Sequence, residues 1–110
     1  MKIAIVGSRS LSVSNLEEYI PSECSEIVSG GARGIDSCAA KFAKKKDLPH
    51  IEFLPDYKKF GKAAPILRNK QIVNYADLVL VFWDGASRGS RFVIDYAKKI
   101  GKPCRIFLAK

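Results

Sequence analysis

The sequence predicts an α/β protein, a single Rossmann-like domain over residues 1–110 with three layers around a five-stranded, mostly parallel sheet. Three observations support this prediction. Short apolar runs alternate with helix-type patterns along the whole chain. The runs at 2–6 and 78–83 are apolar almost throughout, as in strands that are buried on both faces. Turns rich in Gly, Ser and Arg follow several runs, and right-handed crossovers favour the strand order 3-2-1-4-5.

The elements follow in order from local signals. The expected strands are 2–6, 26–29, 50–54, 78–83 and 104–108. Ser14 with Glu17 three residues later has capping-box spacing and predicts the start of a first helix. A second helix is expected over 34–46, because its apolar residues recur on one face: Ile35, Cys38, Ala39, Phe42 and Ala43.

The last two helices are marked by their ends. A third helix is expected to begin near Pro65, a residue suited to a first helical turn. Its inner face is predicted to hold Ile66, Val73 and Ala76, with Asn69 in the middle of that face. A fourth helix is expected to end at Gly101, just before Pro103. Its apolar stripe comprises Phe92, Val93, Tyr96, Ala97 and Ile100.

Composition limits the class of protein. With 110 residues and 47% hydrophobic content, the chain has enough apolar side chains for one modest core. No run approaches the roughly 18 apolar residues of a membrane span, and no signal peptide is apparent, so a cytoplasmic location is expected. Three widely spaced cysteines indicate reduced thiols, and neither a disulfide framework nor a metal site is expected. The formal charge of +8 favours anionic partners, although a solvated basic surface explains it equally well.

Three loops are the candidate functional elements. They read GSRS at 7–10, SGGARGID at 29–36 and DGASRGS at 84–90, and each follows a strand of the predicted sheet. The carboxyl ends of parallel strands share one edge, and ligands bind there at the point where the winding reverses. Glycines allow a close backbone approach, and helix starts attract anions. The three loops together therefore predict an anion site. Neither a dinucleotide fingerprint nor a P-loop is present, which argues against a nicotinamide enzyme or a Walker-type ATPase.

Several single residues have two readings. Asn69 either satisfies loop carbonyls or shapes the pocket, and Asp36 suits the first turn of a helix because of the helix dipole. Asp84 either orients its loop or binds a ribose hydroxyl. Trp83 either stacks on a base or covers the end of the sheet. His50, at the start of a strand, is read as structural, and the lysines at 44–46 as a solvated helix end.

The motifs also resemble a known group. IAIVGSRS, VSGGARGIDSCAAKFA and ILRNKQIVNYADLVLVFWDGASRGSRFVIDYAKKIGKPCRIF look like the SLOG superfamily of Rossmann-like proteins, in the order of its elements across nearly the whole chain. The chain is most similar to small stand-alone bacterial and phage members related to the YpsA group. This resemblance implies a protein that senses or processes a nucleotide-derived ligand, and relatives that commonly pair as homodimers.

Two better-understood relatives imply different activities. The DNA-processing protein A of natural transformation shares the S-G-x-A-R-G-I-D loop and the R-N pair, here Arg68 and Asn69, and it binds single-stranded DNA and a recombinase. The cytokinin-activating phosphoribohydrolases carry P-G-G-x-G-T-x-x-E. The corresponding stretch here is DGASRGSRFV, in which Ser90 replaces the threonine and Val93 replaces the catalytic glutamate. That departure argues against glycosidic-bond hydrolysis by the same mechanism.

The main hypothesis is therefore nucleotide binding at the sheet edge, with no metal and no cofactor other than the nucleotide ligand. The alternatives are a hydrolase of a nucleotide N-glycosidic or phosphate bond, with Asp36 or Asp84 as acid or base, and a single-stranded DNA-binding module that uses Trp83 and Tyr57. The predicted ligand-binding residues are Gly7, Ser8, Arg9, Ser29, Gly30, Gly31, Arg33, Gly34, Arg68, Asn69, Asp84, Gly85, Ser87, Gly89 and Ser90.

Overall fold

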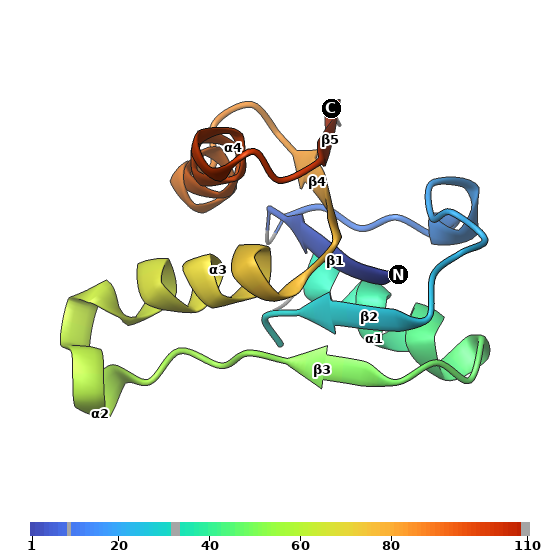
Figure 1. Ribbon diagram of the computed structural model, residues 1–110, viewed down its shortest axis with the longest axis horizontal. Coiled ribbons are helices and arrows are strands. Elements are labelled where there is room, and N and C mark those ends of the chain that lie inside the picture. Colours follow the sequence, from blue (N-terminus) through green and yellow to red (C-terminus); the bar gives the residue numbers. More distant parts are fainter. Residues whose placement is uncertain (9, 32–33, 109–110) are drawn as a thin grey trace.

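A computed structural model describes residues 1–8, 10–31 and 34–108 of the chain (Figure 1). Its strands and helices alternate as the sequence predicts. The strands are β1 (Lys2–Gly7), β2 (Glu26–Ser29), β3 (His50–Glu52), β4 (Leu78–Trp83) and β5 (Cys104–Leu108). The α-helices are α1 (Ile35–Lys45), α2 (Tyr57–Phe60), α3 (Ala64–Tyr75) and α4 (Arg88–Ile100), and two 3₁₀ segments are η1 (Leu16–Glu18) and η2 (Gly61–Ala63).

The five strands form one sheet in the order β3-β2-β1-β4-β5, which confirms the predicted order. All four pairings between neighbouring strands are parallel. The pairing of β1 with β4 is among the longest and runs from Ile3 opposite Leu78 to Gly7 opposite Phe82. Because every strand runs the same way, the loops that follow the strands all emerge at one edge of the sheet.

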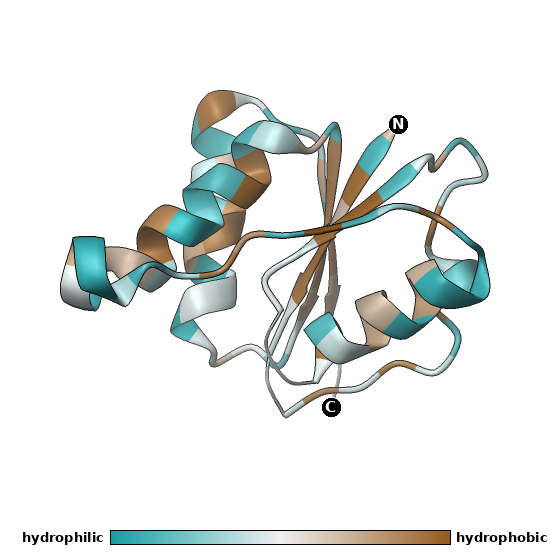
Figure 2. Cartoon of the chain, turned by 90° about the horizontal axis from the view of Figure 1, so that it is seen from below, coloured by the Kyte–Doolittle hydropathy of each residue, from teal (hydrophilic) through white to brown (hydrophobic). Residues whose placement is uncertain are grey.

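Helices cover both faces of the sheet and make the three predicted layers (Figure 2). On one face, Ile3, Ile5 and Leu80 pack with α1 and with Leu16 of η1. On the other face, strand valines pack against α3 and α4. Side chains alternate between these two clusters along β1 and β4, so both central strands are buried on both sides. This burial explains why their sequences are apolar throughout.

The first crossover differs from the prediction. The expected helix after Ser14 is a single 3₁₀ turn, η1, preceded by Asn15, and no side chain caps it. Asn15 instead donates from Nδ2 to Glu18 Oε2 at 2.6 Å. Pro21 follows a few residues later, and a proline disfavours helical backbone at the residue before it. The crossover therefore holds a single short helical turn, and the described residues around it form turns, bends and irregular segments.

Other boundaries lie close to those expected. The second helix spans Ile35–Lys45, with Ile35, Ala39 and Ala43 buried, and the fourth ends at Gly101 as predicted. The third strand is shorter than predicted and ends at Glu52. The sequence analysis missed α2, whose signal is Asp56: its carboxylate accepts the Lys59 N–H at 3.1 Å as an N-cap.

Two predicted inner positions are wrong. Ile66 on α3 and Ile100 on α4 are exposed, whereas Asn69, Ile72 and Val73 form the buried face of α3. Each misplaced isoleucine lies near a helix end: Ile66 is the third residue of α3 and Ile100 is the last residue of α4. The three cysteines are free, as predicted, and burial raises the pKa of the Cys24 and Cys104 thiols.

The end of α4 allows a test of local backbone stability. Gly101 has φ of 74°, in the left-handed region where a side chain is strained. We expect Gly101→Ala to lower the free energy of unfolding by about 1 kcal/mol in urea denaturation. Gly89, inside α4, has open space around its Cα, so Gly89→Ala is the matched control and should raise stability by about 0.5 kcal/mol. Equal effects of the two substitutions would contradict the assigned backbone conformation.

Candidate functional site

A cavity of about 440 Å³ opens at the carboxyl ends of β1, β2 and β4, beside α3. It lies where the winding of the sheet reverses between β1 and β4. All three predicted loops contribute to it. The residues that line it are Val6, Gly7, Ser8, Ser10, Gly30, Asp36, Pro65, Arg68, Asn69, Ile72, Asp84, Ser87, Gly89 and Ser90.

Arg68 holds the loop that follows β2. Its Nη1 donates to the Gly30 carbonyl at 2.9 Å and, at 3.5 Å, to the Phe53 carbonyl after β3. A side chain on Gly30 would collide with the guanidinium group. Glycine at position 30 therefore lets a cation lie directly on the loop backbone. Arg68 is thus both a wall of the cavity and a brace between two strand ends.

Asn69 is buried, and it accepts from Arg68 Nε at 2.8 Å through Oδ1. A buried amide without a partner costs free energy, and this bond supplies one. The same residue lines the cavity beside Ile72. The amide oxygen thus orients the arginine and does not meet a loop carbonyl, and Asn69 lines the pocket as the second reading has it.

Asp84 organises the loop between β4 and α4. Its Oδ1 accepts the N–H groups of Ala86 at 2.9 Å and Ser87 at 2.8 Å. These two backbone hydrogen bonds lower the pKa of Asp84, so the carboxylate is ionised at neutral pH. The Asp84 N–H donates to Ser8 Oγ at 3.3 Å, which joins this loop to the one after β1.

Asp36 lies in the first turn of α1, where the helix dipole favours a carboxylate. Gly34 is the N-cap of α1 and makes no side-chain cap bond. One Asp36 carboxylate oxygen approaches the same side of Gly30 as the Arg68 guanidinium group. The cavity therefore presents a carboxylate and a guanidinium group together on one side of Gly30.

The structure brings most, though not all, predicted site residues to this cavity. Ser29, Gly31, Gly34 and Gly85 lie outside its lining. Arg9 and Arg33 lie outside the described residues. Sequence reasoning missed Val6, Ser10, Pro65 and Ile72, of which only Ser10 had a signal, as the last residue of the first loop. Arg91 does not reach the site, because its Nε pairs with Asp95 at 3.5 Å on the exposed side of α4.

Trp83 covers the end of the sheet, one of its two predicted readings. Its ring packs partly buried against the α3–α4 core, and Nε1 donates to the Ser87 carbonyl at 3.0 Å. The indole thus fastens the β4–α4 loop to the end of the sheet.

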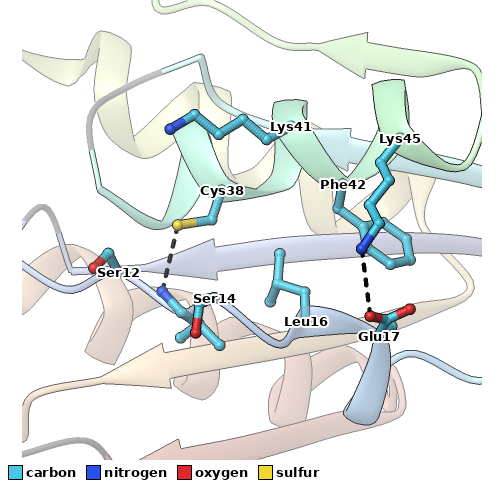
Figure 3. A pocket seen from close by; sticks show the side chains of 9 residues that line it. Ser12, Ser14, Leu16, Glu17, Cys38, Lys41, Phe42 and Lys45 are labelled. Carbon is cyan, nitrogen blue, oxygen red and sulfur yellow. Dashed lines mark hydrogen bonds and ion pairs between the residues drawn. The ribbon is translucent and has the colours of Figure 1, made fainter.

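A second cavity, of about 340 Å³, lies between α1 and the 12–17 segment (Figure 3). Its floor is apolar, with Leu16 and Phe42, and Lys41 and Lys45 stand at its rim. Cys38 Sγ accepts the Val13 N–H at 3.3 Å. None of the three predicted loops contributes to this lining, and the sequence analysis did not anticipate it.

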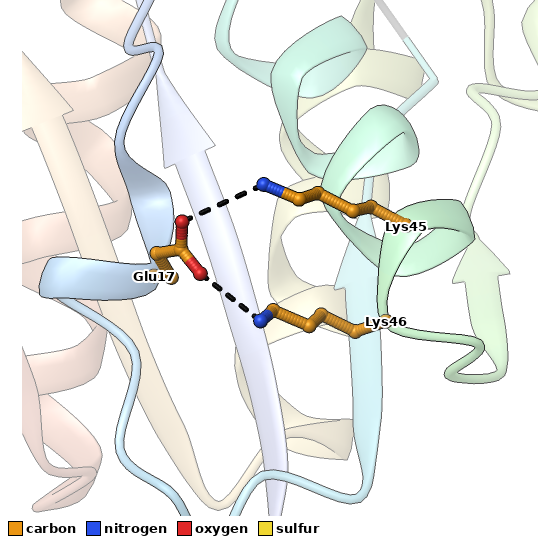
Figure 4. Close-up of polar contacts among 3 residues, drawn as sticks. All are labelled: Glu17, Lys45 and Lys46. Carbon is orange, nitrogen blue, oxygen red and sulfur yellow. Dashed lines mark ion pairs between the residues drawn. The ribbon is translucent and has the colours of Figure 1, made fainter.

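Glu17 neutralises part of the lysine run beside that cavity (Figure 4). Its carboxylate lies 3.0 Å from Lys46 Nζ and 3.6 Å from Lys45 Nζ. The hydrogen bond from Lys46 and the charge of Lys45 lower the pKa of Glu17. The run at 44–46 thus secures η1 to the end of α1 as well as complementing the helix dipole.

Among the described residues, no group of three or more His, Cys, Asp or Glu side chains is placed to hold a metal ion. Within residues 1–8, 10–31 and 34–108, no helix is long and apolar enough to span a membrane.

The doubly wound sheet and the crevice at its switch point define a Rossmann-like protein of the SLOG type. The family model of DNA recombination-mediator protein A matches residues 1–64, and the chain belongs to this family. This match confirms the resemblance inferred from the motifs.

A solved structure has the same fold: DNA processing protein A (DprA) from Streptococcus pneumoniae, with a TM-score of 0.79 over 99% of this chain. Sequence identity is 21%, so the likeness shows the fold alone. The chain spans 50% of that protein's length. No curated protein matches the sequence.

The Asp84 turn predicts a pH-dependent contribution to stability. The pKa of Asp84 is lowered on folding, so its contribution is present above the ordinary value of 3.8 and is lost as the pH falls through the folded pKa. We expect Asp84→Asn to be less stable than wild type in urea at neutral pH. The difference should vanish once the wild-type carboxyl is protonated in acid. Asp95→Asn removes the same charge from the exposed face of α4 and should have a smaller effect; a pH-independent loss for Asp84→Asn would contradict the assignment.

Proposed function

We propose that the cavity at the β1–β4 switch point binds a nucleotide through its ribose-phosphate unit. One observation supports this proposal above the others: the cavity combines two helix starts with a guanidinium group and two carboxylates. A simple anion needs only donors. A ribose phosphate also carries hydroxyl groups, which need acceptors.

The donors come from the starts of α1 and α4. The first intrahelical bonds, from Cys38 N–H to the Gly34 carbonyl and from Arg91 N–H to the Ser87 carbonyl, leave the preceding N–H groups for other acceptors. Gly89 and Ser90 in the first turn of α4 line the cavity. Backbone N–H groups at a helix start and the dipole behind them favour a phosphate.

The acceptors are Asp36 and Asp84. Asp84 Oδ1 is occupied by its turn, so the second carboxylate oxygen is the one available to a ligand hydroxyl. Pockets for small ligands commonly enclose about 300–1,000 Å³. The cavity of about 440 Å³ lies within this range and suits a mononucleotide better than a dinucleotide.

Hydrolysis of the nucleotide is the less favoured reading of the same cavity. Val93, which takes the place of the catalytic glutamate of the phosphoribohydrolases, is completely buried in the α3–α4 core. Asp84 is not a proton donor at neutral pH, because its pKa is lowered. Asp36 is then the candidate acid for such a reaction, and Asp84 could serve only as a base.

Asp36→Asn tests the proposed ribose contact. Loss of a charged acceptor should weaken binding of ribose 5-phosphate about fivefold, while loss of the negative charge should leave inorganic phosphate bound equally or more tightly. Isothermal titration with the two ligands measures this ratio directly. Asp95→Asn, which changes the net charge equally but lies on the exposed side of α4, is the control. Equal changes in affinity for the two ligands would show that Asp36 does not contact the ribose. If the wild type bound neither ligand, the proposal would be rejected.

Single-stranded DNA is a second candidate ligand, and a separate surface favours it. Tyr57 and Phe60 on α2 are 57% and 41% exposed, and lysines lie between them and after them at positions 58, 59 and 62. Lys59 Nζ lies 5.3 Å above the Phe60 ring. Arg68 lines both the main cavity and a hollow of about 300 Å³ beside α2, so a strand could run from one to the other. Aromatic rings among cations are the usual means of holding unpaired bases.

Tyr57→Ala and Phe60→Ala should each weaken binding of a short single strand by about 1–3 kcal/mol if a base stacks there. The stacking part should persist near about 150 mM salt, whereas phosphate contacts fade by about 0.7 log unit per contact for each log unit of salt. Fluorescence anisotropy with matched single strands and duplexes measures both quantities. Ile66→Ala, an exposed aliphatic position nearby, is the control. If single strands and duplexes bind equally weakly, and if salt abolishes the binding of both, the interaction is due to net charge alone.

A further inference from the structure

Three polar side chains form a chain of contacts on the α1 face of the sheet, next to the cavity but outside its lining. Ser29 Oγ lies 2.7 Å from His50 Nε2, and His50 Nδ1 lies 3.7 Å from Glu52 Oε1. Ser29 is completely buried, whereas the side chains of His50 and Glu52 are 17% and 43% exposed. The order hydroxyl, imidazole, carboxylate is that of a proton relay. The buried hydroxyl is closed to a substrate, so the contacts do not make Ser29 a nucleophile.

Both ends of this chain of contacts reach the loop after β2. Ser29 is the residue before Gly30, which lines the cavity. The Glu52 carboxylate lies against Gly31, in the space that a side chain there would occupy. The imidazole therefore connects the last residue of β2 to an acidic group that stands beside the predicted anion loop.

The charge of the imidazole changes what an anion experiences in that loop. With a neutral ring, Ser29 donates to Nε2, and the negative charge of Glu52 opposes an anion at Gly30 and Gly31. Protonation reverses the Ser29 bond, because Nε2–H then donates to Oγ. It also places a positive charge beside Glu52 and offsets that carboxylate. Histidine is the side chain that ordinarily changes charge between about pH 5 and 8.

Other charged groups on the neighbouring elements also bear on this imidazole. The helix packed on this face, α1, carries Asp36 in its first turn and Lys44 and Lys45 in its last turn. Glu26 on β2 is turned to the opposite face, where it accepts from Tyr75 Oη at 2.7 Å. Glu52 is the group with which the imidazole makes an ion-pair contact.

We propose that His50 is a proton-linked positioning residue of the anion site: protonation of its imidazole, held between Ser29 and Glu52, strengthens anion binding in the cavity that Gly30 lines. This inference rests on the proposed function, because it needs an anion in that cavity. By linkage, an anion that binds better to the protonated form must in turn raise the midpoint of the imidazole titration.

The test uses sulfate, whose charge does not change between about pH 5.5 and 8, the interval in which histidine titrates. We expect sulfate to bind about fivefold more tightly at the lower pH, at the small end of couplings between distinct groups in proteins. His50→Gln keeps a side chain that can hydrogen-bond to Ser29 but cannot titrate, and its sulfate affinity should not follow this pH dependence. Glu52→Gln should bind sulfate at the higher pH nearly as tightly as wild type does at the lower pH. Circular dichroism confirms that each variant is folded.

His50 is the single histidine of the chain, so its imidazole proton signals in an NMR titration need no assignment against others. Sulfate should raise the titration midpoint by about 0.7 unit, the shift that corresponds to a fivefold change in affinity. An unchanged midpoint, or equal sulfate affinity at both pH values, would overturn the proposal. If sulfate does not bind at either pH, the anion site itself fails and the proposal with it. In that case, the imidazole titration midpoints of wild type and Glu52→Gln are compared without sulfate. Different midpoints would show that His50 and Glu52 interact although the anion site is absent. Equal midpoints would show that the two side chains do not interact.

Discussion

The parallel pairing of β1 with β4 is the constraint on which the rest of this protein depends. These strands are adjacent in the sheet but lie more than seventy residues apart in the sequence, and each is buried on both faces. The hydrogen bonding continues beyond the strands: the Ser8 N–H donates to the Phe82 carbonyl at 3.1 Å, and the Asp84 N–H donates to Ser8 Oγ. The relative position of the two loops is thus set by the sheet. A ligand that bridges them meets a prearranged pair of loops and need not order them, which lowers the entropic cost of binding.

Neighbouring acidic groups neutralise several of the basic side chains of this protein. The formal net charge of +8 suggests a general affinity for anions, yet Glu17 neutralises lysines at the end of α1, and Arg91 pairs with Asp95. Arg68 faces the cavity, where it is committed to the carbonyl of Gly30. Carboxylates stand in the same cavity as the donors. On the proposed function, this placement of acceptors beside donors would favour a ligand that carries hydroxyl groups, because an anion without them gains nothing from Asp36 and Asp84.

The fold was predictable because the strongest signals are regional. Alternation of apolar runs with helical patterns determines the class, and the handedness of crossovers then limits the strand order. The roles and positions of single residues were harder to predict from the sequence. Ser14 has the right spacing for a cap, but only a 3₁₀ turn follows it, and Ile66 has helical spacing but is exposed near the start of its helix. In the site, the loops that approach the cavity followed from topology, whereas the partners of Arg68 and the contacts of His50 depend on residues far apart in the sequence. No local pattern encodes such contacts.

The unusual first crossover has a consequence for how this domain can vary. The segment between β1 and β2 contains one 3₁₀ turn, and it is fastened to the α1 side through the buried Leu16, the Glu17 ion pairs and the sulfur of Cys38. Between Leu11 and Cys24 it contributes no strand to the sheet. Lengthening a surface connection costs only about 0.6 kcal/mol for each doubling of its length. The later part of this crossover, around Ser22 and Glu23, can therefore accommodate insertions, or even a full helix, with the sheet unchanged, because neither residue lines the main cavity.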